Sequence, residues 1–148
     1  MTIARTPVCD LLGIERPIVL AAMVDVPELS AAVSNAGGLG MQTLTWSDDV
    51  GASVRATAAL TSRPFCGNLV LTDDRHDRLD QALEAGLKVV SFFMGDPSGY
   101  VDRAHEAGAI VLHTVGTAEE ARRAATCGGR SRPCRWCPRW STRWRRRR

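Results

Sequence analysis

Short apolar runs alternate along the chain with longer segments that mix alanine with polar residues. The apolar runs are Ile18–Ala21, Leu39–Gln42, Phe65–Leu71, Lys88–Phe92 and Ile110–Val115. Successive runs begin 21, 26, 23 and 22 residues apart. Continuous apolar runs of this length are typical of strands buried on both faces of a parallel sheet. Each gap has room for one helix, so the pattern predicts an α/β fold of about five β/α units.

Signals for the start and end of a helix lie in every gap. They are Pro27 with Gly37–Gly38, Ser47 with Asp48 and Asp49, Leu79 with Gly86, Pro97–Ser98 with Gly108, and the capping-box spacing of Thr117–Glu120. We expect Ser47 to cap the second of these helices, because carboxylates in the first turn are stabilised by the positive end of the helix dipole.

The last 23 residues differ in composition from the rest of the chain. Residues 126–148 hold nine of the 19 basic residues, three of the five Cys, three of the four Trp, and no Asp or Glu. Residues 1–125 carry 10 basic and 16 acidic groups, a net charge of −6, whereas the tail carries +9. Read from the third base of each codon, the tail can encode an ordinary apolar segment. We therefore expect residues 126–148 to be an out-of-frame, disordered tail that forms no domain.

The tail contains two features that imitate binding motifs. Cys134 and Cys137 form one Cys-x-x-Cys pair, without the second pair of a structural zinc site. Trp136, Trp140 and Trp144 lie among arginines, a combination that can stack on single-stranded nucleic acid and neutralise it. Because both features fall in the out-of-frame segment, we expect no metal site and no specific nucleic-acid binding.

Candidate site residues follow the apolar runs, because parallel β/α folds bind ligands beyond the carboxyl ends of their strands. Ala22 and Met23 offer a small side chain and backbone amides that suit a flat aromatic ligand, with ordinary barrel packing as the alternative. Asn68 interrupts its apolar run, and a buried amide needs a hydrogen-bond partner. It therefore either binds a ligand or bridges neighbouring strands. His113 and Thr114 end the last run and lie on the same candidate edge.

The glycines of Gly37–Gly40 look like a phosphate-binding loop. They precede an apolar run instead of opening a helix. We therefore interpret them as a helix stop and a tight turn.

Residues 10–125 resemble the nitronate monooxygenase family, formerly called 2-nitropropane dioxygenases, whose members are FMN-dependent TIM-barrel oxidoreductases. The matching stretches are Pro17–Met23 (PIVLAAM), Pro27–Gly40 (PELSAAVSNAGGLG), Gly67–Leu69 (GNL), Val89–Pro97 (VVSFFMGDP) and His113–Thr117 (HTVGT). The family usually has Pro in place of Ala22 and Ala-Gly near Val24–Asp25. The combination is specific, although each stretch alone is a weak signal.

The resemblance implies a site for FMN. It places Ala22 and Met23 near the isoalloxazine ring, Asn68 in contact with FMN, and Thr114 where the family often has Lys or Gln facing the flavin. The family's motif that carries the catalytic His is absent from the translated sequence, so no catalytic residue is assigned. A TIM barrel typically needs about 250 residues and eight strands. We therefore expect residues 1–125 to be the N-terminal part of such a barrel, and the chain not to retain FMN.

The implied activity is the FMN-dependent oxidation of alkyl nitronates by O₂ to carbonyl compounds, with this chain a truncated, inactive fragment. One alternative is an FMN-dependent enoyl reductase of the same superfamily, which would use a nicotinamide donor. Another is a non-functional pseudogene product, or an incidental nucleic-acid binder through the basic tail. No apolar run approaches the roughly 20 residues of a membrane span, and Met1–Cys9 lacks the apolar core of a signal peptide. We therefore expect a cytoplasmic protein with no membrane partner.

Overall fold

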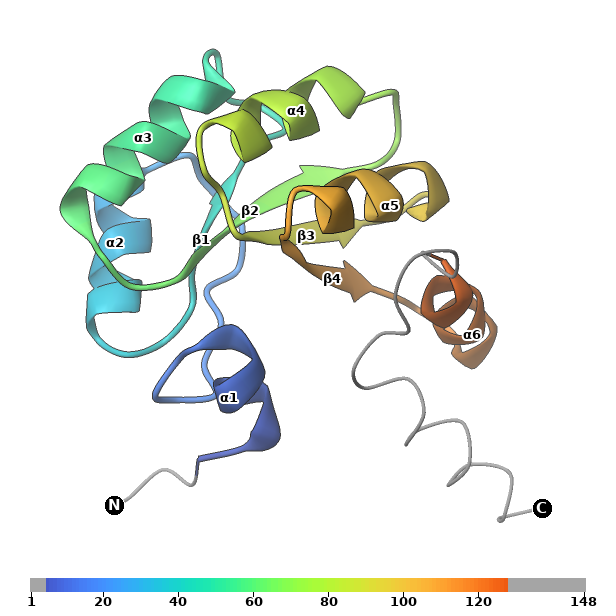
Figure 1. Cartoon of the computed structure of the whole chain (residues 1–148), viewed down its shortest axis with the longest axis horizontal. Coiled ribbons are helices and arrows are strands. Elements are labelled where there is room, and N and C mark those ends of the chain that lie inside the picture. Colours follow the sequence, from blue (N-terminus) through green and yellow to red (C-terminus); the bar gives the residue numbers. More distant parts are fainter. Residues whose placement is uncertain (1–4, 128–148) are drawn as a thin grey trace.

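The computed structural model of the chain describes residues 5–127, in which parallel strands alternate with helices (Figure 1). The strands are β1 (Gly40–Thr43), β2 (Phe65–Val70), β3 (Val89–Phe93) and β4 (Ile110–Thr114). The helices are α1 (Pro7–Leu12), α2 (Pro27–Asn35), α3 (Val50–Leu60), α4 (His76–Glu84), α5 (Ser98–Glu106) and α6 (Ala118–Thr126). The sheet order is β1-β2-β3-β4, so each strand pairs with the next along the chain. This confirms the expected α/β class with a parallel sheet; within the described residues the sheet does not close into a barrel.

The prediction of a regular strand over Ile18–Ala21 was wrong. This segment makes a single parallel bridge, between Val19 and Leu39, the residue before β1. Two backbone hydrogen bonds support the bridge: Leu39 N–H donates to Ile18 O and Leu20 N–H to Leu39 O, each at 2.9 Å. Among the described residues the sheet therefore has four regular strands, and this segment pairs beside them without forming a fifth.

A two-residue bulge ends the pairing of this segment. In an uninterrupted ladder the Thr43 amide would reach the carbonyl of Ala22. It donates instead to Val24 O at 3.3 Å, two residues further on. Met23 N–H donates to Ala21 O at 2.9 Å, which folds the extra residues into a tight turn. The bulge therefore pushes the backbone around Ala22 out of the sheet at the candidate edge.

Two apolar clusters cover the two faces of the sheet. On the outer face, Leu69, Val90 and Phe92 pack with the buried residues of α3, α4 and α5. On the opposite face, Met41, Cys66 and Val89 pack against α1 and its flanking residues. Figure 1 shows α1 on the side of the sheet opposite α3, α4 and α5. We call the face that carries Met41, Cys66 and Val89 the inner face.

Helix caps agree with the sequence patterns at most positions. The expected capping box is present in part: Thr117 Oγ1 accepts from the Glu120 amide at 3.1 Å. The cap of α3 was predicted wrongly, because Asp49 occupies it, accepting from Ala52 N–H at 2.8 Å. A carboxylate is as good a helix cap as a hydroxyl, so residue type alone did not distinguish Asp49 from Ser47 as the cap of α3. Helix α1 was not predicted.

The glycines before β1 form a turn, as interpreted from the sequence. Gly37 has φ of 90°, which ends α2 in a left-handed conformation that favours glycine. Gly40 packs against α2 so closely that a Cβ atom there would overlap the carbonyl oxygen of Ser30. Its amide donates to Ser34 Oγ at 3.0 Å, and this hydroxyl donates to Pro64 O at 2.8 Å. These glycines therefore end α2 and connect it closely to β1, which agrees with their interpretation as a helix stop and a tight turn.

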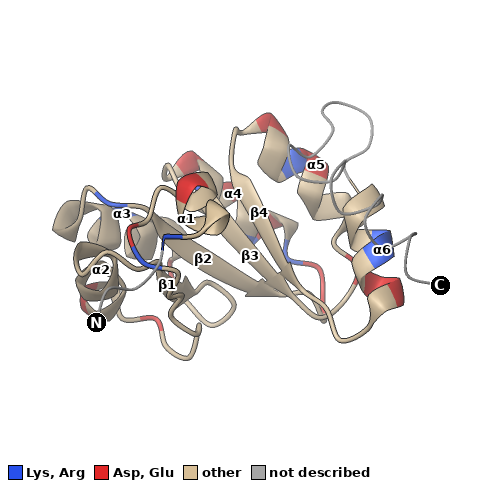
Figure 2. Ribbon diagram, turned by 90° about the horizontal axis from the view of Figure 1, so that it is seen from below, with Lys and Arg blue, Asp and Glu red and all other residues tan. Residues whose placement is uncertain are grey.

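Charged residues avoid the strands. Figure 2 shows Lys, Arg, Asp and Glu on the helices and connecting segments, with β1 to β4 free of them. No helix within residues 5–127 is long and apolar enough to cross a bilayer. The prediction that residues 126–148 form a disordered tail falls almost entirely on residues outside the described part. Of these residues the structure describes Thr126, the last residue of α6, and Cys127.

Candidate functional site

Polar side chains form a row across the inner face near the carboxyl ends of three strands. The strand register places Thr43 beside Asn68 and Asn68 beside Ser91. Residues in register on adjacent parallel strands project to the same face. All three side chains are buried. The row therefore lies at the edge where parallel sheets bind ligands.

Asn68 bridges two strands in this row. Its Nδ2 atom donates to the carbonyl oxygen and to the hydroxyl of Ser91, each at 3.2 Å. This is the structural alternative that the sequence left open. Both bonds use the amide nitrogen of the carboxamide. The contact of Asn68 with FMN stays a prediction.

Thr43 carries a buried hydroxyl without a partner. Its side chain is 2% exposed, and Oγ1 makes no hydrogen bond within the described part of the chain. An unpaired buried polar group costs about 1–3 kcal/mol, so such groups normally have a partner. The position next to Asn68 makes this hydroxyl a ligand-binding candidate. Thr43 directly follows the apolar run Leu39–Gln42, so strand-end reasoning includes it in the candidate edge, and the register of β1 with β2 places it on the face of Asn68.

Ala22 and Met23 lie in the bulge beside this row. Ala22 packs against the cluster on the inner face, whereas Met23 is exposed. The Val24 carbonyl bonded to the Thr43 amide joins the bulge to the row. The structure thus brings the two predicted residues to the same edge as Asn68.

A buried hydrogen-bond chain fixes the end of this segment from the outer side. Gln42 Nε2 donates to Ser53 Oγ at 2.8 Å, and Ser53 Oγ donates to Asp25 Oδ1 at 2.5 Å. Thr57 Oγ1 donates to Gln42 Oε1. Since Ser53 and Thr57 belong to α3, the helix holds the segment that follows the bulge against β1.

Thr114 and Phe93 extend the inner face towards β4. They are in register as the last residues of their strands, and both are exposed. By alternation they share the face of Asn68 and Ser91. The four predicted site residues, Ala22, Met23, Asn68 and Thr114, therefore all lie at one edge of the inner face, with Thr114 across the sheet from the bulge.

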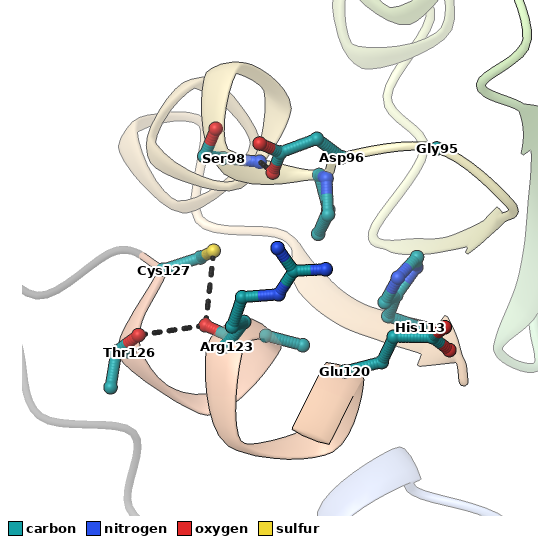
Figure 3. Close-up of a pocket in the computed structure, with 10 residues that line it drawn as sticks. Gly95, Asp96, Ser98, His113, Glu120, Arg123, Thr126 and Cys127 are labelled. Atoms are coloured by element: carbon teal, nitrogen blue, oxygen red, sulfur yellow. Dashed lines mark hydrogen bonds between the residues drawn. The ribbon is translucent and has the colours of Figure 1, made fainter. Parts of the chain in front are cut away.

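His113 points to the other side of the sheet. It is in register with Phe92, which belongs to the outer cluster, and its Nδ1 lies 3.2 Å from Phe92 O. It lines a separate cavity of about 340 Å³ between the loop after β3 and α6. Figure 3 shows the Arg123 guanidinium extending towards Asp96 in this cavity. His113 was expected at the candidate edge with Thr114; it does lie near the end of β4, but the register places it on the outer face.

The cavity around His113 is close to balanced in charge. Asp96 and Glu120 oppose Arg123. Hydrogen bonds from the Ser98 amide and hydroxyl, helped by Arg123 and His113, hold the pKa of Asp96 below its usual range. Asp96 therefore occupies the amino end of α5, where an external anion would otherwise bind.

The inner face can bind a ligand, but its described strand residues supply no group for proton transfer at neutral pH. Among them Cys66 has the one titratable side chain, and burial raises the pKa of that thiol far above its usual range. Among residues 5–127 no three His, Cys, Asp or Glu side chains are arranged to hold a metal ion. The available chemistry is hydrogen bonding by Thr43, Asn68 and backbone amides, with apolar contact from Ala22.

Comparisons with known proteins place the chain among flavin-type oxidoreductases by similarity. A family model described as nitronate monooxygenase matches residues 5–80. A nitronate monooxygenase of Pseudomonas aeruginosa is 49% identical over 63 residues, which covers 40% of this chain and 18% of that protein. The (3aS,4S,5R,7aS)-5-hydroxy-7a-methyl-1-oxo-octahydro-1H-indene-4-carboxyl-CoA dehydrogenase of Mycobacterium tuberculosis is 36% identical over 130 residues, covering 84% of this chain and 36% of that protein.

Solved structures share the fold of the described residues. FabK from Thermotoga maritima superposes with a TM-score of 0.79 and 34% identity, covering 84% of this chain and 42% of that one. A nitroalkane oxidase from Streptomyces ansochromogenes gives a TM-score of 0.69 and 28% identity, covering 83% of this chain and 46% of that one. The chain thus spans less than half the length of these relatives.

Proposed function

Because the chain belongs to the nitronate monooxygenase family, we propose that its inner face is the amino-terminal part of an FMN site. The enzyme reaction is the oxidation of alkyl nitronates by O₂ to carbonyl compounds. The observation that carries this proposal is the row of Thr43, Asn68 and Ser91 beside the Ala22 bulge, in which the Thr43 hydroxyl has no partner among the described residues.

The residues present fit a flavin ring system. A planar heteroaromatic ring needs a flat apolar support and hydrogen-bonding groups at its edge. The small side chain of Ala22 and the displaced backbone of the bulge suit the first need. The Thr43 hydroxyl, which has no hydrogen-bond partner within the described part, and the Asn68 carboxamide suit the second. Thr114 lies at the far side of the same face.

Bound FMN would supply the redox chemistry, accepting electrons from the nitronate and passing them to O₂. The role of this chain's residues is to bind and orient. Asn68, fixed by its two hydrogen bonds to Ser91, presents its carbonyl oxygen in one direction. Apolar side chains below the row, such as Met41 and Cys66, exclude water from under the ring. No proton transfer is assigned to a described residue.

The described part contributes little to binding of the FMN phosphate. None of the residues in β1 to β4 is Lys or Arg. We therefore propose that the 148-residue chain alone holds less than one equivalent of FMN. Family members of full length would supply the phosphate-binding groups and the catalytic base from segments that this chain does not match.

A chimera tests the proposal. Residues 1–125 would be joined to the carboxyl-terminal part of the Pseudomonas aeruginosa nitronate monooxygenase, and FMN binding and nitronate-dependent O₂ uptake would be measured. We expect flavin absorbance near one equivalent and O₂ uptake. A folded chimera that binds no flavin would refute the assignment of the inner face.

A hydroxyl-deletion variant locates the flavin contact. Thr43→Val removes the unpaired hydroxyl at nearly constant volume. A hydrogen bond contributes roughly 0.5–1.5 kcal/mol, so FMN affinity of the chimera should fall about two- to tenfold. Stability without FMN should stay the same or rise. Unchanged FMN affinity would show that Thr43 does not touch the flavin.

A reductase acting on thioesters is the second candidate. The observation that favours it is the match to a carboxyl-CoA dehydrogenase over 84% of this chain, more than the nitronate monooxygenase match covers. The FMN-dependent enoyl reductase reaction is the form of this alternative to test. NAD(P)H oxidation that depends on an enoyl thioester, without O₂ uptake on a nitronate, would select it.

A further inference from the structure

We propose that the loops at the carboxyl edge of the sheet form an apolar rim that selects a substrate with a bulky, uncharged apolar body and rejects polyanionic carriers such as coenzyme A. The apolar rim is defined as Met23, Trp46, Phe93 and Met94. The inference deepens the proposed function, because it takes the inner face as the place where the substrate reacts.

The rim side chains are unusually exposed for their type. Met23 is 76% exposed, Trp46 68% and Met94 52%. They follow three different chain segments: the segment beside β1, β1 itself and β3. All three segments end at the carboxyl edge, next to the polar row of Thr43 and Asn68. Large apolar side chains exposed along one edge of a sheet are candidates for a site of interaction.

The exposure of Trp46 is imposed by a rigid loop. Thr45 Oγ1 accepts the Val70 amide of β2 at 2.9 Å, which ties the loop to the sheet. On its other side, Arg78 Nη1 donates to the carbonyl oxygens of Leu44 and Ser47, at 2.9 and 2.7 Å. The residues on both sides of Trp46 are therefore anchored while its ring remains in solvent. A loop that only connected two elements would not need this support.

The backbone around Met94 is constrained as well. Met94 has φ of 60°, and it is the one residue other than glycine with positive φ among residues 5–127. Gly95 follows with φ of 61°, and a Cβ atom there would lie 2.8 Å from Leu71 Cβ. Leu71 N–H donates to Phe93 O at 2.9 Å. The tight packing on Leu71 thus fixes the direction of the exposed Met94 side chain.

The charge around the rim excludes polyanions. The carboxyl-edge loops, residues 21–26, 44–49, 71–75, 94–97 and 115–117, contain six Asp and one Arg. That Arg, Arg75, is paired with Asp73 at 3.1 Å. Two guanidinium groups from helices also reach this edge, Arg78 at the carbonyl groups of Leu44 and Ser47 and Arg123 beside Asp96, and they offset part of the negative charge without cancelling it. The amino-edge loops, residues 13–17, 36–39, 61–64, 85–88 and 107–109, contain one Glu, two Arg and one Lys. Negative charge is therefore concentrated where the substrate enters.

Two of these carboxylates, Asp74 and Asp96, have hydrogen bonds that favour the charged form. Hydrogen bonds from His76 hold the pKa of Asp74 below its usual range, and those from Ser98 do the same for Asp96. Charges around a site raise the local concentration of ligands of opposite sign and lower that of like sign. A nitronate adds a single negative charge, whereas coenzyme A adds several phosphate charges. The rim therefore suits an apolar substrate whose reacting group is its one charge.

Two probes with the same ten-carbon chain test the rim: decanamide, which is neutral, and decanoyl-CoA. Both are titrated into the 148-residue chain and into a chain that ends at Cys127, because the arginines of residues 128–148 would themselves attract coenzyme A. The comparison on the shorter chain decides between the two probes. Binding is followed by the fluorescence of Trp46, isolated by subtracting the titration of Trp46→Phe, which retains the other tryptophans. We expect saturable binding of decanamide, and at low salt about tenfold weaker binding of decanoyl-CoA. The difference should shrink in about 0.5 M salt, because salt screens surface charges.

Met94→Asn supplies the test variant and Leu60→Ser its control. Asn tolerates the left-handed backbone, so the first variant removes the apolar side chain without straining the turn. Leu60 is an exposed apolar residue at the end of α3, on the amino-edge side of the sheet. Met94→Asn should weaken decanamide binding about fivefold, and Leu60→Ser should leave it unchanged. Urea melts check that both variants are folded.

Three results would overturn the proposal: tighter binding of decanoyl-CoA than of decanamide at low salt, equal effects of the two variants, or no Trp46 response up to about 1 mM decanamide. The titration needs no FMN. A folded chimera that failed to bind FMN would therefore refute the proposed function and leave the outcome for the rim readable.

Discussion

Gly40→Ala should destabilise the chain far more than a single added methyl group suggests. Gly40 opens β1 where α2 packs directly on the strand. A Cβ atom would overlap Ser30 O, and it would lie 2.7 Å from both the carbonyl carbon of Ser30 and the hydroxyl oxygen of Ser34. Real Cβ atoms essentially never come closer than 3.0 Å, and two of these neighbours are backbone atoms. Helix α2 must therefore move as a body.

The cost has two parts. Overpacking a close contact costs about 1–3 kcal/mol. Movement of α2 also stretches the bond from the Gly40 amide to Ser34 Oγ, at 3.0 Å, and the bond from Ser34 to Pro64 O, at 2.8 Å. Each hydrogen bond contributes about 0.5–1.5 kcal/mol. The central values of these ranges sum to about 4 kcal/mol, a large share of the roughly 5–15 kcal/mol that stabilises a typical domain.

Urea denaturation measures this loss directly. With a slope of about 2 kcal/mol per M, the midpoint should fall by roughly 1.5–2 M. Gly116→Ala is the matched control, because its nearest contact would be Glu120 Oε2 at 3.5 Å and its φ is not positive. The control should stay within about 0.5 kcal/mol of the wild type. A Gly40→Ala midpoint equal to that of the control would refute the packing of α2 on β1 described above.

Three further changes probe other parts of the fold. Asn68→Ala should cost about 1–2 kcal/mol of apo stability in a urea melt, since it deletes both hydrogen bonds to Ser91; no loss would mean that the bridge is absent. Asp49→Ala should cost about 1 kcal/mol by removing the α3 cap on Ala52 N–H, and Asp49→Asn should restore it. Because the folded pKa of Asp96 is lowered, its stabilisation should be complete above the unfolded pKa, about 3.9, and be lost as the pH falls through the folded value. Asp96→Asn should therefore be less stable than the wild type at pH 7 but not at pH 2, as measured by thermal melts at each pH.

Element order could be predicted from the sequence, because each buried strand is a continuous apolar run and each helix has its own start and stop residues. The choice between neighbouring residues for the same structural role was harder to predict. Asp49 displaced Ser47 as a cap since both are suitable residues two positions apart. Helix α1 carried readable signals, with Pro7 at its first turn and a left-handed Gly13 at its end.

The site was predictable in position but not in detail. Its edge followed from strand ends, which sequence reveals. The bulge at Ala22 did not, because it depends on which carbonyl the Thr43 amide selects across the sheet. Alternation would have separated His113 from Thr114, whereas the placement of Thr43 beside Asn68 depends on the register of β1 with β2. The FMN contacts inferred from the family remain predictions.

The strands lie in the sheet in the same order as they follow along the chain, and this has a consequence for folding during synthesis. Each strand from β2 to β4 pairs with the one made just before it. As the chain leaves the ribosome, every new β/α unit can add to an edge that already exists, without waiting for distant segments. The same order leaves the newest strand with an unpaired edge at every stage, open to pairing with another nascent chain. The next strand of the same chain and a strand of another chain therefore compete for this unpaired edge. Slow decoding after β4 would favour the second process and hence aggregation.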